Sequence, residues 1–170
     1  VGPGLVLPIG ISFYTFQIIS YMADVYRKDV EAQPSFLKFL MYVTMYHQLV
    51  AGPIVRYRWI AQEIDHREVD SVEVWQGLCR FCVGLCKKVV VANAAGKLAG
   101  QYLDGDLSRL TTAGALFGIL MFTIQIYYDF SAYSDMAIGM GRIFGFHYME
   151  NFNYPYIARS VTDFWRRWHI

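Results

Sequence analysis

The sequence predicts an all-α protein that crosses a membrane several times. Hydrophobic residues make up 55% of the 170 residues and charged residues only 17%, a balance that does not suit an ordinary soluble domain. Two stretches of about 19 residues carry no formal charge, which as helices are long enough to cross most of a ~30 Å hydrocarbon layer. The net charge of +1, with lysine and arginine spread along the chain, argues against a nucleic-acid partner.

The first two predicted spans lie in the N-terminal third of the chain. Residues 5–23 form one of the charge-free stretches, and its length favours a helix. Residues 36–55 form the second span, interrupted by Lys38, whose ammonium group can reach the membrane surface, and by His47. The polar residues 56–72 then return the chain to water.

A third helix is predicted over residues 74–103. Asp70, followed three residues later by Glu73, forms a capping-box pattern at its start. The helix contains four charged residues, Arg80, Lys87, Lys88 and Lys97. This charge is too costly for a span that faces lipid on all sides, so we expect a helix at the membrane surface or lining a bundle, bent near residues 93–96.

Small side chains in this part of the chain indicate packing rather than chemistry. Two sets at four-residue spacing predict close helix contacts: Ala92, Gly96 and Gly100, and then Ala137, Gly141 and Gly145. One further set falls on a single helical stripe: Cys79, Cys82 and Cys86. No fourth ligand follows at zinc-site spacing, so we expect these cysteines to pack as small apolar residues.

The strongest predicted span, residues 110–128, runs directly into a cluster of polar residues. The cluster comprises Asp129, Ser131, Tyr133, Ser134 and Asp135. A carboxylate within a span is costly and is kept mainly where it lines a water-filled cavity or meets a partner. Asp129 therefore either pairs with an arginine from another helix or takes part in substrate binding or proton handling.

The C-terminal residues predict a loop followed by a helix. Residues 147–158 form the loop, and the helix begins near Val161. A step of about 100° per residue divides this helix into an aromatic half, which holds Phe164, Trp165, Trp168 and His169, and a polar half with Arg166. An imidazole at the edge of an aromatic wall can act as a general base near neutral pH, and the alternative is a histidine that is merely packed.

Several blocks of the sequence carry a resemblance to a known family. They are PIGISFYTFQ (8–17), DVYR (24–27), GPIVR (52–56), YDFSAYSDMAIG (128–139), ENFN (150–153) with PY (155–156), and DFWRRWHI (163–170). Together they resemble the membrane-bound O-acyltransferase family, in its bacterial alginate O-acetyltransferase branch. The resemblance implies that residues 1–170 are the central part of one domain, incomplete at both ends, within a ring of transmembrane and re-entrant helices.

The resemblance also implies a function and a set of partners. Acyl groups would pass from a cytoplasmic thioester, acetyl-CoA or an acyl-carrier thioester, to a hydroxyl of an exported or cell-wall polysaccharide, with no bound cofactor. Membrane lipid and a periplasmic or extracellular acetyltransferase would be partners, and the protein would be a multi-pass protein of the bacterial inner membrane. His169 would be catalytic, with the family's second histidine beyond Ile170, and Trp165, Arg166 and Trp168 would join the polar cluster in lining the substrate tunnel.

The sequence is also compatible with two other functions. The first is D-alanyl transfer to teichoic acid, fed by a carrier protein. The second is a transporter or channel subunit in which Asp129 and Asp135 bind a coupling ion, a class that predicts internal repeats not seen in the sequence. We also expect at least one C-terminal arginine to be structural and to pair with Asp135 or Asp163.

Overall fold

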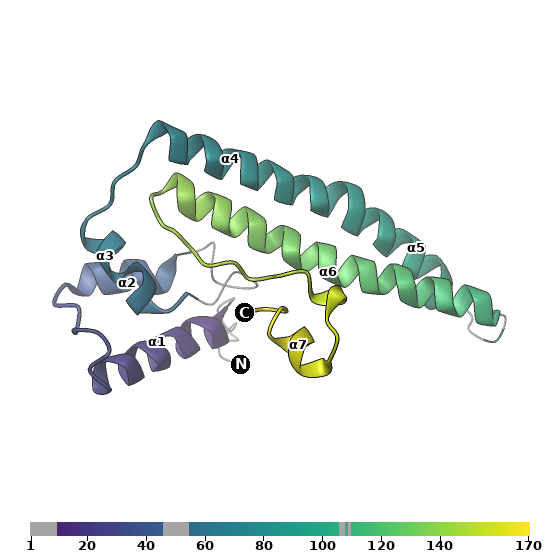
Figure 1. The fold of residues 1–170 in the computed structure, drawn as a ribbon, viewed down its shortest axis with the longest axis horizontal. Coiled ribbons are helices and arrows are strands. Elements are labelled where there is room, and N and C mark those ends of the chain that lie inside the picture. The colour runs from purple at the N-terminus through teal and green to yellow at the C-terminus, as the bar shows by residue number, and fades with distance from the viewer. Residues whose placement is uncertain (1–9, 46–54, 106–107, 109) are drawn as a thin grey trace, which may run out of the picture.

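The computed structural model describes residues 10–45, 55–105, 108 and 110–170. All regular secondary structure in these residues is helical, apart from one isolated β-bridge between Phe152 and Trp168. The predicted all-α class is therefore confirmed for this part of the chain. Figure 1 shows two long helical rods lying side by side, a cluster of shorter helices at one end of them, and a short C-terminal helix below their middle.

The cluster at one end consists of α1 (Ile11–Tyr26), α2 (Phe36–Thr44) and α3 (Tyr57–Asp65). Tyr42 of α2 is fully buried in the shared core, and its ring meets that of Tyr57 edge-on at 5.2 Å. The core extends to the C-terminal half of the chain through Phe146 and Tyr148. This contact joins the cluster to the long helices.

The two predicted N-terminal spans are helical over residues 11–23 and 36–44, whereas Gly10, Met45 and Val55 are described but not helical. α1 confirms a helix from residue 11, and residues 5–9 of the predicted span lie outside the described residues. α2 ends at Thr44, and residues 46–54 of the predicted span, including His47, also lie outside them. Sequence patterning missed α3, whose buried residues Tyr57, Ile60 and Ile64 form an apolar stripe within the polar segment.

The first long rod is one continuous helical run of three parts, α4 (Ser71–Cys86), the π-helical segment η2 (Lys87–Ala92) and α5 (Asn93–Leu103). The predicted helix is confirmed and begins three residues early. Its departure from α-helical geometry lies at Lys87–Ala92, not at residues 93–96 as expected.

The predicted capping box at the start of α4 is wrong. Asp70 occupies the N-cap position, but its side chain makes no capping hydrogen bond. The carboxylate of Glu73 accepts instead from Nε of Arg142, at 2.8 Å, and lies 3.0 Å from Nε2 of His147. The Glu73 carboxylate is therefore bound to side chains at and beyond the end of α6, not to the start of its own helix.

The second long rod is α6 (Thr112–Ile143), which runs antiparallel to the first. Among the described residues it is the one helix long and apolar enough to cross a membrane, as expected for the strongest span. The backbones of the rods meet at two places. A Cβ built on Gly77 would lie 2.6 Å from the carbonyl oxygen of Gly139, and one on Gly84 would lie 2.7 Å from that of Ala132.

The predicted contacts of the small residues with neighbouring helices are confirmed only in part. Gly96 packs against the side chain of Gln125 from α6, as expected, whereas Gly100 meets only Asp104 near the end of its own helix. Gly141 packs against the ring of Tyr148. Gly145 packs against the loop before α4 rather than against a helix, since a Cβ built on it would lie 3.0 Å from Cγ2 of Val69 and 3.1 Å from the carbonyl oxygen of Glu68. Its φ of 78° ends α6, and the amide that follows it bonds back to the carbonyl of residue 141 at 2.8 Å.

The three cysteines are exposed, contrary to the predicted apolar packing. The face of α4 that contacts α6 carries Gly77 and Gly84, where the backbones come closest. The cysteine stripe therefore points away from the packed face.

The chain after α6 forms a loop with a short 3₁₀ turn, η4 (Pro155–Ile157), and then α7 (Val161–Trp165). The loop and the helix start are confirmed, and the Ser160 hydroxyl caps α7 by accepting from the amide of Asp163 at 3.0 Å. The expected continuation of the helix to His169 is wrong, because α7 ends at Trp165 and His169 has a φ of 52°.

Backbone pairing explains why α7 stops. The amide of Asn153 donates to the carbonyl of Arg167 at 2.9 Å, and the amide of Ile170 donates to the carbonyl of Asn151 at 3.0 Å. These antiparallel contacts, on either side of the bridge between Phe152 and Trp168, provide partners that another helical turn would otherwise supply. His169 is thereby placed next to the loop rather than on a helix face.

Candidate active site

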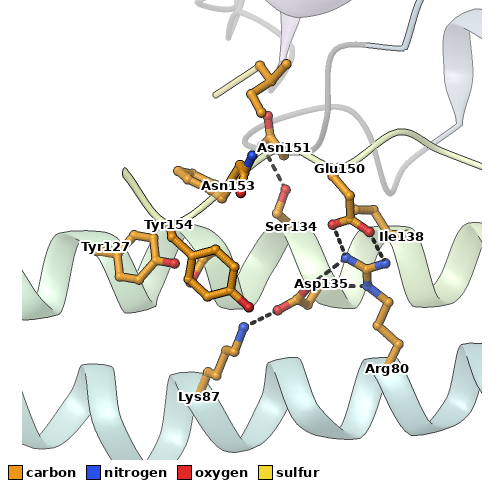
Figure 2. A pocket seen from close by; sticks show the side chains of 13 residues that line it. Arg80, Lys87, Tyr127, Ser134, Asp135, Ile138, Glu150, Asn151, Asn153 and Tyr154 are labelled. Atoms are coloured by element: carbon orange, nitrogen blue, oxygen red, sulfur yellow. Dashed lines mark hydrogen bonds and ion pairs between the residues drawn. The ribbon is translucent and has the colours of Figure 1, made fainter. Parts of the chain in front are cut away.

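A polar cavity of about 580 Å³ opens between the two rods and the loop that follows α6. The first rod lines it with Arg80 and Lys87, and α6 contributes Ser131, Ser134 and Asp135 among others. The loop closes it with residues 150–154, and Ile170 reaches it from the C-terminal segment. Figure 2 shows Arg80 and Lys87, both from the first rod, reaching Asp135 on α6, with Glu150 of the loop against Arg80.

Asp135 is the centre of an ion-pair network in this cavity. One carboxylate oxygen accepts from Nε and Nη2 of Arg80 at 3.2 and 3.0 Å, and the other accepts from Lys87 at 2.6 Å. Arg80 donates at the same time to both oxygens of Glu150. The side chain of Asp135 is only 15% exposed, so its charge is offset by these cations rather than by bulk solvent.

Asp129 is held outside the cavity by the neighbouring lysine of η2. Its carboxylate pairs with Lys88 at 2.5 Å, and Asp129 does not line the cavity. The pairing alternative predicted for Asp129 is thus observed, with a lysine in place of the expected arginine. Arg80, Lys87 and Lys88 of the first rod thus pair with carboxylates of α6, as expected for a helix that lines a bundle, whereas Lys97 is exposed.

A chain of side-chain hydrogen bonds connects α6 to His169. Asn151 is almost completely buried, with 1% of its surface exposed. Its Nδ2 donates to the Ser134 hydroxyl at 2.7 Å, and its Oδ1 lies 2.8 Å from Nδ1 of His169. Asn151 therefore stands between the cavity, which it lines, and the imidazole, which does not line it.

The ring of Phe130 packs against His169 and belongs to an aromatic cluster with Phe152 and Trp168. The imidazole lies 4.9 Å from the Phe130 ring, and Trp168 packs at 5.1 Å, edge-on, against Phe152. Burial among these rings lowers the pKa of His169 below its ordinary value. The imidazole is consequently neutral near pH 7, the state in which one ring nitrogen can accept a proton.

The predicted site residues are only partly brought together. Ser131, Ser134 and Asp135 line the cavity, whereas Asp129 and Tyr133 do not. Of the C-terminal residues, Trp168 belongs to the aromatic cluster, and Trp165 and Arg166 are exposed on and just after α7, away from the cavity.

Among the lining residues that were not predicted, four make the side-chain hydrogen bonds described above: Arg80, Lys87, Glu150 and Asn151. Unusual charge inside a helix was a signal for Arg80 and Lys87, although it did not reveal their partner. Asn151 carried no such signal, because its position depends on the pairing of two loop segments. The expected structural role for a C-terminal arginine is confirmed, since Arg167 donates to Asp163 at 2.9 Å.

A second cluster of titratable groups lies at the junction of the helix cluster and the rods. The ring of His147 bridges two carboxylates, with Nδ1 2.8 Å from Glu63 and Nε2 3.0 Å from Glu73. These bonds, that to Glu63 first, raise the pKa of His147 above its ordinary value. Within the part of the chain that the structure describes, no group of three or more histidine, cysteine, aspartate or glutamate side chains is arranged to hold a metal ion.

Comparison with known proteins gives a consistent set of relatives. The sequence model of the membrane-bound O-acyltransferase family matches residues 26–170. The chain is 46% identical to the probable alginate O-acetylase AlgI of Pseudomonas aeruginosa, over 98% of this chain and 32% of that protein. It is 35% identical to the peptidoglycan O-acetyltransferase of Helicobacter pylori (98% and 36%) and 25% identical to the teichoic acid D-alanyltransferase of Bacillus subtilis (95% and 42%). The chain thus spans about a third of the length of the first of these relatives.

Proposed function

The chain belongs to the membrane-bound O-acyltransferase family, and we propose that it forms part of an O-acetyltransferase that modifies an exported or cell-wall polysaccharide. Family membership makes it part of a membrane protein, in keeping with the length and composition of α6. The acetyl group is favoured because the relatives with 35–46% identity are named as O-acetylating proteins.

The observation that carries the proposal is the setting of His169. The imidazole is neutral and partly enclosed by aromatic rings, and its Nδ1 is hydrogen-bonded to Asn151. Asn151 in turn lines the polar cavity beside α6. A histidine in this state can take the proton from an acceptor hydroxyl as that oxygen attacks the acyl carbon. The carbon–oxygen bond forms, the carbon–sulfur bond of a thioester donor breaks, and the proton passes from His169 to the leaving thiolate.

The donor and the partners follow from this chemistry. A thioester such as acetyl-CoA or an acylated carrier would supply the acetyl group from the cytoplasm, and the acceptor would be a saccharide hydroxyl. A multi-pass location in the bacterial inner membrane places donor and acceptor on opposite faces. A periplasmic or extracellular acetyltransferase would complete the transfer to the polysaccharide.

D-alanyl transfer to teichoic acid is the second candidate, supported by relatives at 25% identity. Hydrolysis of the ester in mild base separates the two functions, because one releases acetate and the other D-alanine. The transporter function has less support, since Asp129 and Asp135, which would have to bind a coupling ion, are both held in ion pairs.

Replacement of His169 tests the proposed chemistry. In the membrane-embedded full-length protein, His169→Ala should lower acetylation of the polysaccharide at least about 100-fold, the minimum usually lost with a general base. Membrane abundance should stay unchanged, because His169 lies outside the contact between the two rods. His66→Ala, at an exposed histidine of the loop after α3, is the matched control. Normal acetylation by His169→Ala would overturn the assignment.

A further inference from the structure

We propose that Asn151 is a positioning residue that holds His169 with the proton on Nδ1, leaving Nε2 free to act as the base. The inference rests on the proposed function, because it assigns Asn151 a role only through His169. It adds a residue on the loop after α6 and specifies which imidazole nitrogen takes part in the reaction.

The two ends of the Asn151 amide have different partners. Nδ2 can only donate, and it reaches the Ser134 hydroxyl at 2.7 Å. Oδ1 can only accept, and it lies 2.8 Å from Nδ1 of His169. A bond between these two atoms requires the proton to be on Nδ1, and in a neutral imidazole the lone pair is then on Nε2.

The surroundings keep this amide in place. Asn151 is 1% exposed and Ser134 is 2% exposed, so neither side chain can exchange its partner for bulk water. The backbone carbonyl of Asn151 also accepts from the amide of Ile170, at 3.0 Å, which fixes the distance between the loop and the C-terminal segment. Asn151 is thus held from its backbone and from both ends of its side chain, as a pre-organised orienting group must be.

A neutral partner is suited to this position. The pKa of His169 is lowered by burial, and no charged side chain contributes to that shift among the described residues. The carboxylates of Asp135, on α6, and Glu150, on the loop, are both held by Arg80. The other charged groups of the packed elements are also engaged or exposed: Asp129 pairs with Lys88, Arg142 with Glu73 and Asp163 with Arg167, and Arg166 is exposed. An asparagine therefore orients the imidazole without stabilising its protonated form, whereas an aspartate would favour the imidazolium.

Acetyl-transfer rates of the full-length protein in membranes give the first test. Asn151→Leu, which removes both hydrogen bonds at similar size, should lower the rate about 10- to 100-fold, by analogy with the partners that orient metal-bound histidines. Asn93→Leu, the same change at an exposed residue of α5, is the matched control. Asn151→Asp should keep the orientation but shift the acidic limb of the pH–rate profile to higher pH. An unchanged rate in Asn151→Leu, or an unmoved profile in Asn151→Asp, would overturn the inference.

A double variant separates positioning from general structural damage. If Asn151 acts through His169, Asn151→Leu should cause no further loss when added to His169→Ala. A further loss of the same size in the double variant would show that Asn151 acts independently and would overturn the inference. Full activity of His169→Ala alone would instead refute the proposed function, so the two failures are distinguishable.

The protonated nitrogen can also be observed without any activity measurement. Imidazole ¹⁵N chemical shifts of histidine-labelled protein in lipid distinguish the two neutral forms, and the signal of His169 is assigned by its loss in His169→Gln. The expected spectrum has the proton on Nδ1 in the native protein and a mixture in Asn151→Leu. A proton on Nε2 in the native protein, with Asn151 turned so that Ser134 donates to its oxygen, would overturn the inference.

Discussion

Alanine at position 77 should disturb the contact between α4 and α6, because the two backbones meet there. The new Cβ would lie 2.6 Å from the carbonyl oxygen of Gly139 and 2.9 Å from Cγ1 of Ile143. A backbone oxygen cannot turn away as a side chain can, so the helices must move apart locally. Overpacking of this kind reduces the free energy of unfolding by about 1–3 kcal/mol.

Gly100→Ala isolates this packing effect. At that position the new Cβ would meet only the end of the exposed Asp104 side chain, at 2.8 Å, which can rotate away. Both substitutions also gain about 0.8–1 kcal/mol from the higher helix propensity of alanine. We therefore expect Gly100→Ala to be more stable than the native protein, and Gly77→Ala to fall below Gly100→Ala by about 1–3 kcal/mol.

Unfolding of the two variants by denaturant in the same mixed micelles, followed by far-ultraviolet circular dichroism, measures this difference. The native protein provides the common reference. If Gly77→Ala is as stable as Gly100→Ala, the close approach of α4 and α6 at this glycine is wrong.

Three further predictions concern side-chain interactions. Asp135→Asn should lower the thermal midpoint in detergent, because it removes the charge that holds two partly buried cations. The expected cost is about 1.5–3 kcal/mol for each charged hydrogen bond lost. Asp104→Asn, at an exposed carboxylate, should leave the midpoint unchanged. His147 should stabilise the fold most below pH about 6.5 and lose this contribution as pH rises through its raised folded-state pKa. The difference in stability between the native protein and His147→Gln should therefore shrink as pH rises, and His66→Gln should show no such difference. A difference for His147→Gln that stays constant with pH would contradict this sign. Ser160→Ala should destabilise the protein by about 1 kcal/mol through loss of the α7 cap. Unfolding by denaturant in mixed micelles measures this change, and an unchanged midpoint would contradict the capping role.

The sequence was informative where local composition decides the structure. The charge-free run of residues 110–128 predicted α6, because length and hydropathy alone determine whether a helix can cross a membrane. The carboxylates that continue the run were expected to line a cavity or to meet a partner, and Asp135 does line a cavity while Asp129 pairs with Lys88. The placement of Ser160 as the start of a helix depended only on local capping chemistry.

The sequence was uninformative where distant segments decide the structure. The lysine opposite Asp129 and the two cations around Asp135 depend on the relative rotation of the two rods, which no local pattern specifies. The end of α7 depends on pairing between the C-terminal segment and the loop that contains Asn151. For the same reason helical periodicity placed His169 on the wrong element, although it identified the residue itself as a candidate.

The π-helical segment η2 lies between α4 and α5, so the number of residues in the first rod decides which face of α5 packs against α6. α4 faces α6 with two glycines, and α5 faces it with Ala95 and Ala99, which are 5% and 3% exposed. A wider turn between them changes the angular phase of one helix relative to the other. Because a π-helical turn holds one residue more than an α-helical turn, deleting one residue from Lys87–Ala92 would let the segment close into regular α-helix with the facing of α5 kept. Deleting one residue from the α-helical turns on either side would instead rotate α5 by about 100° and turn these alanines away from their partner.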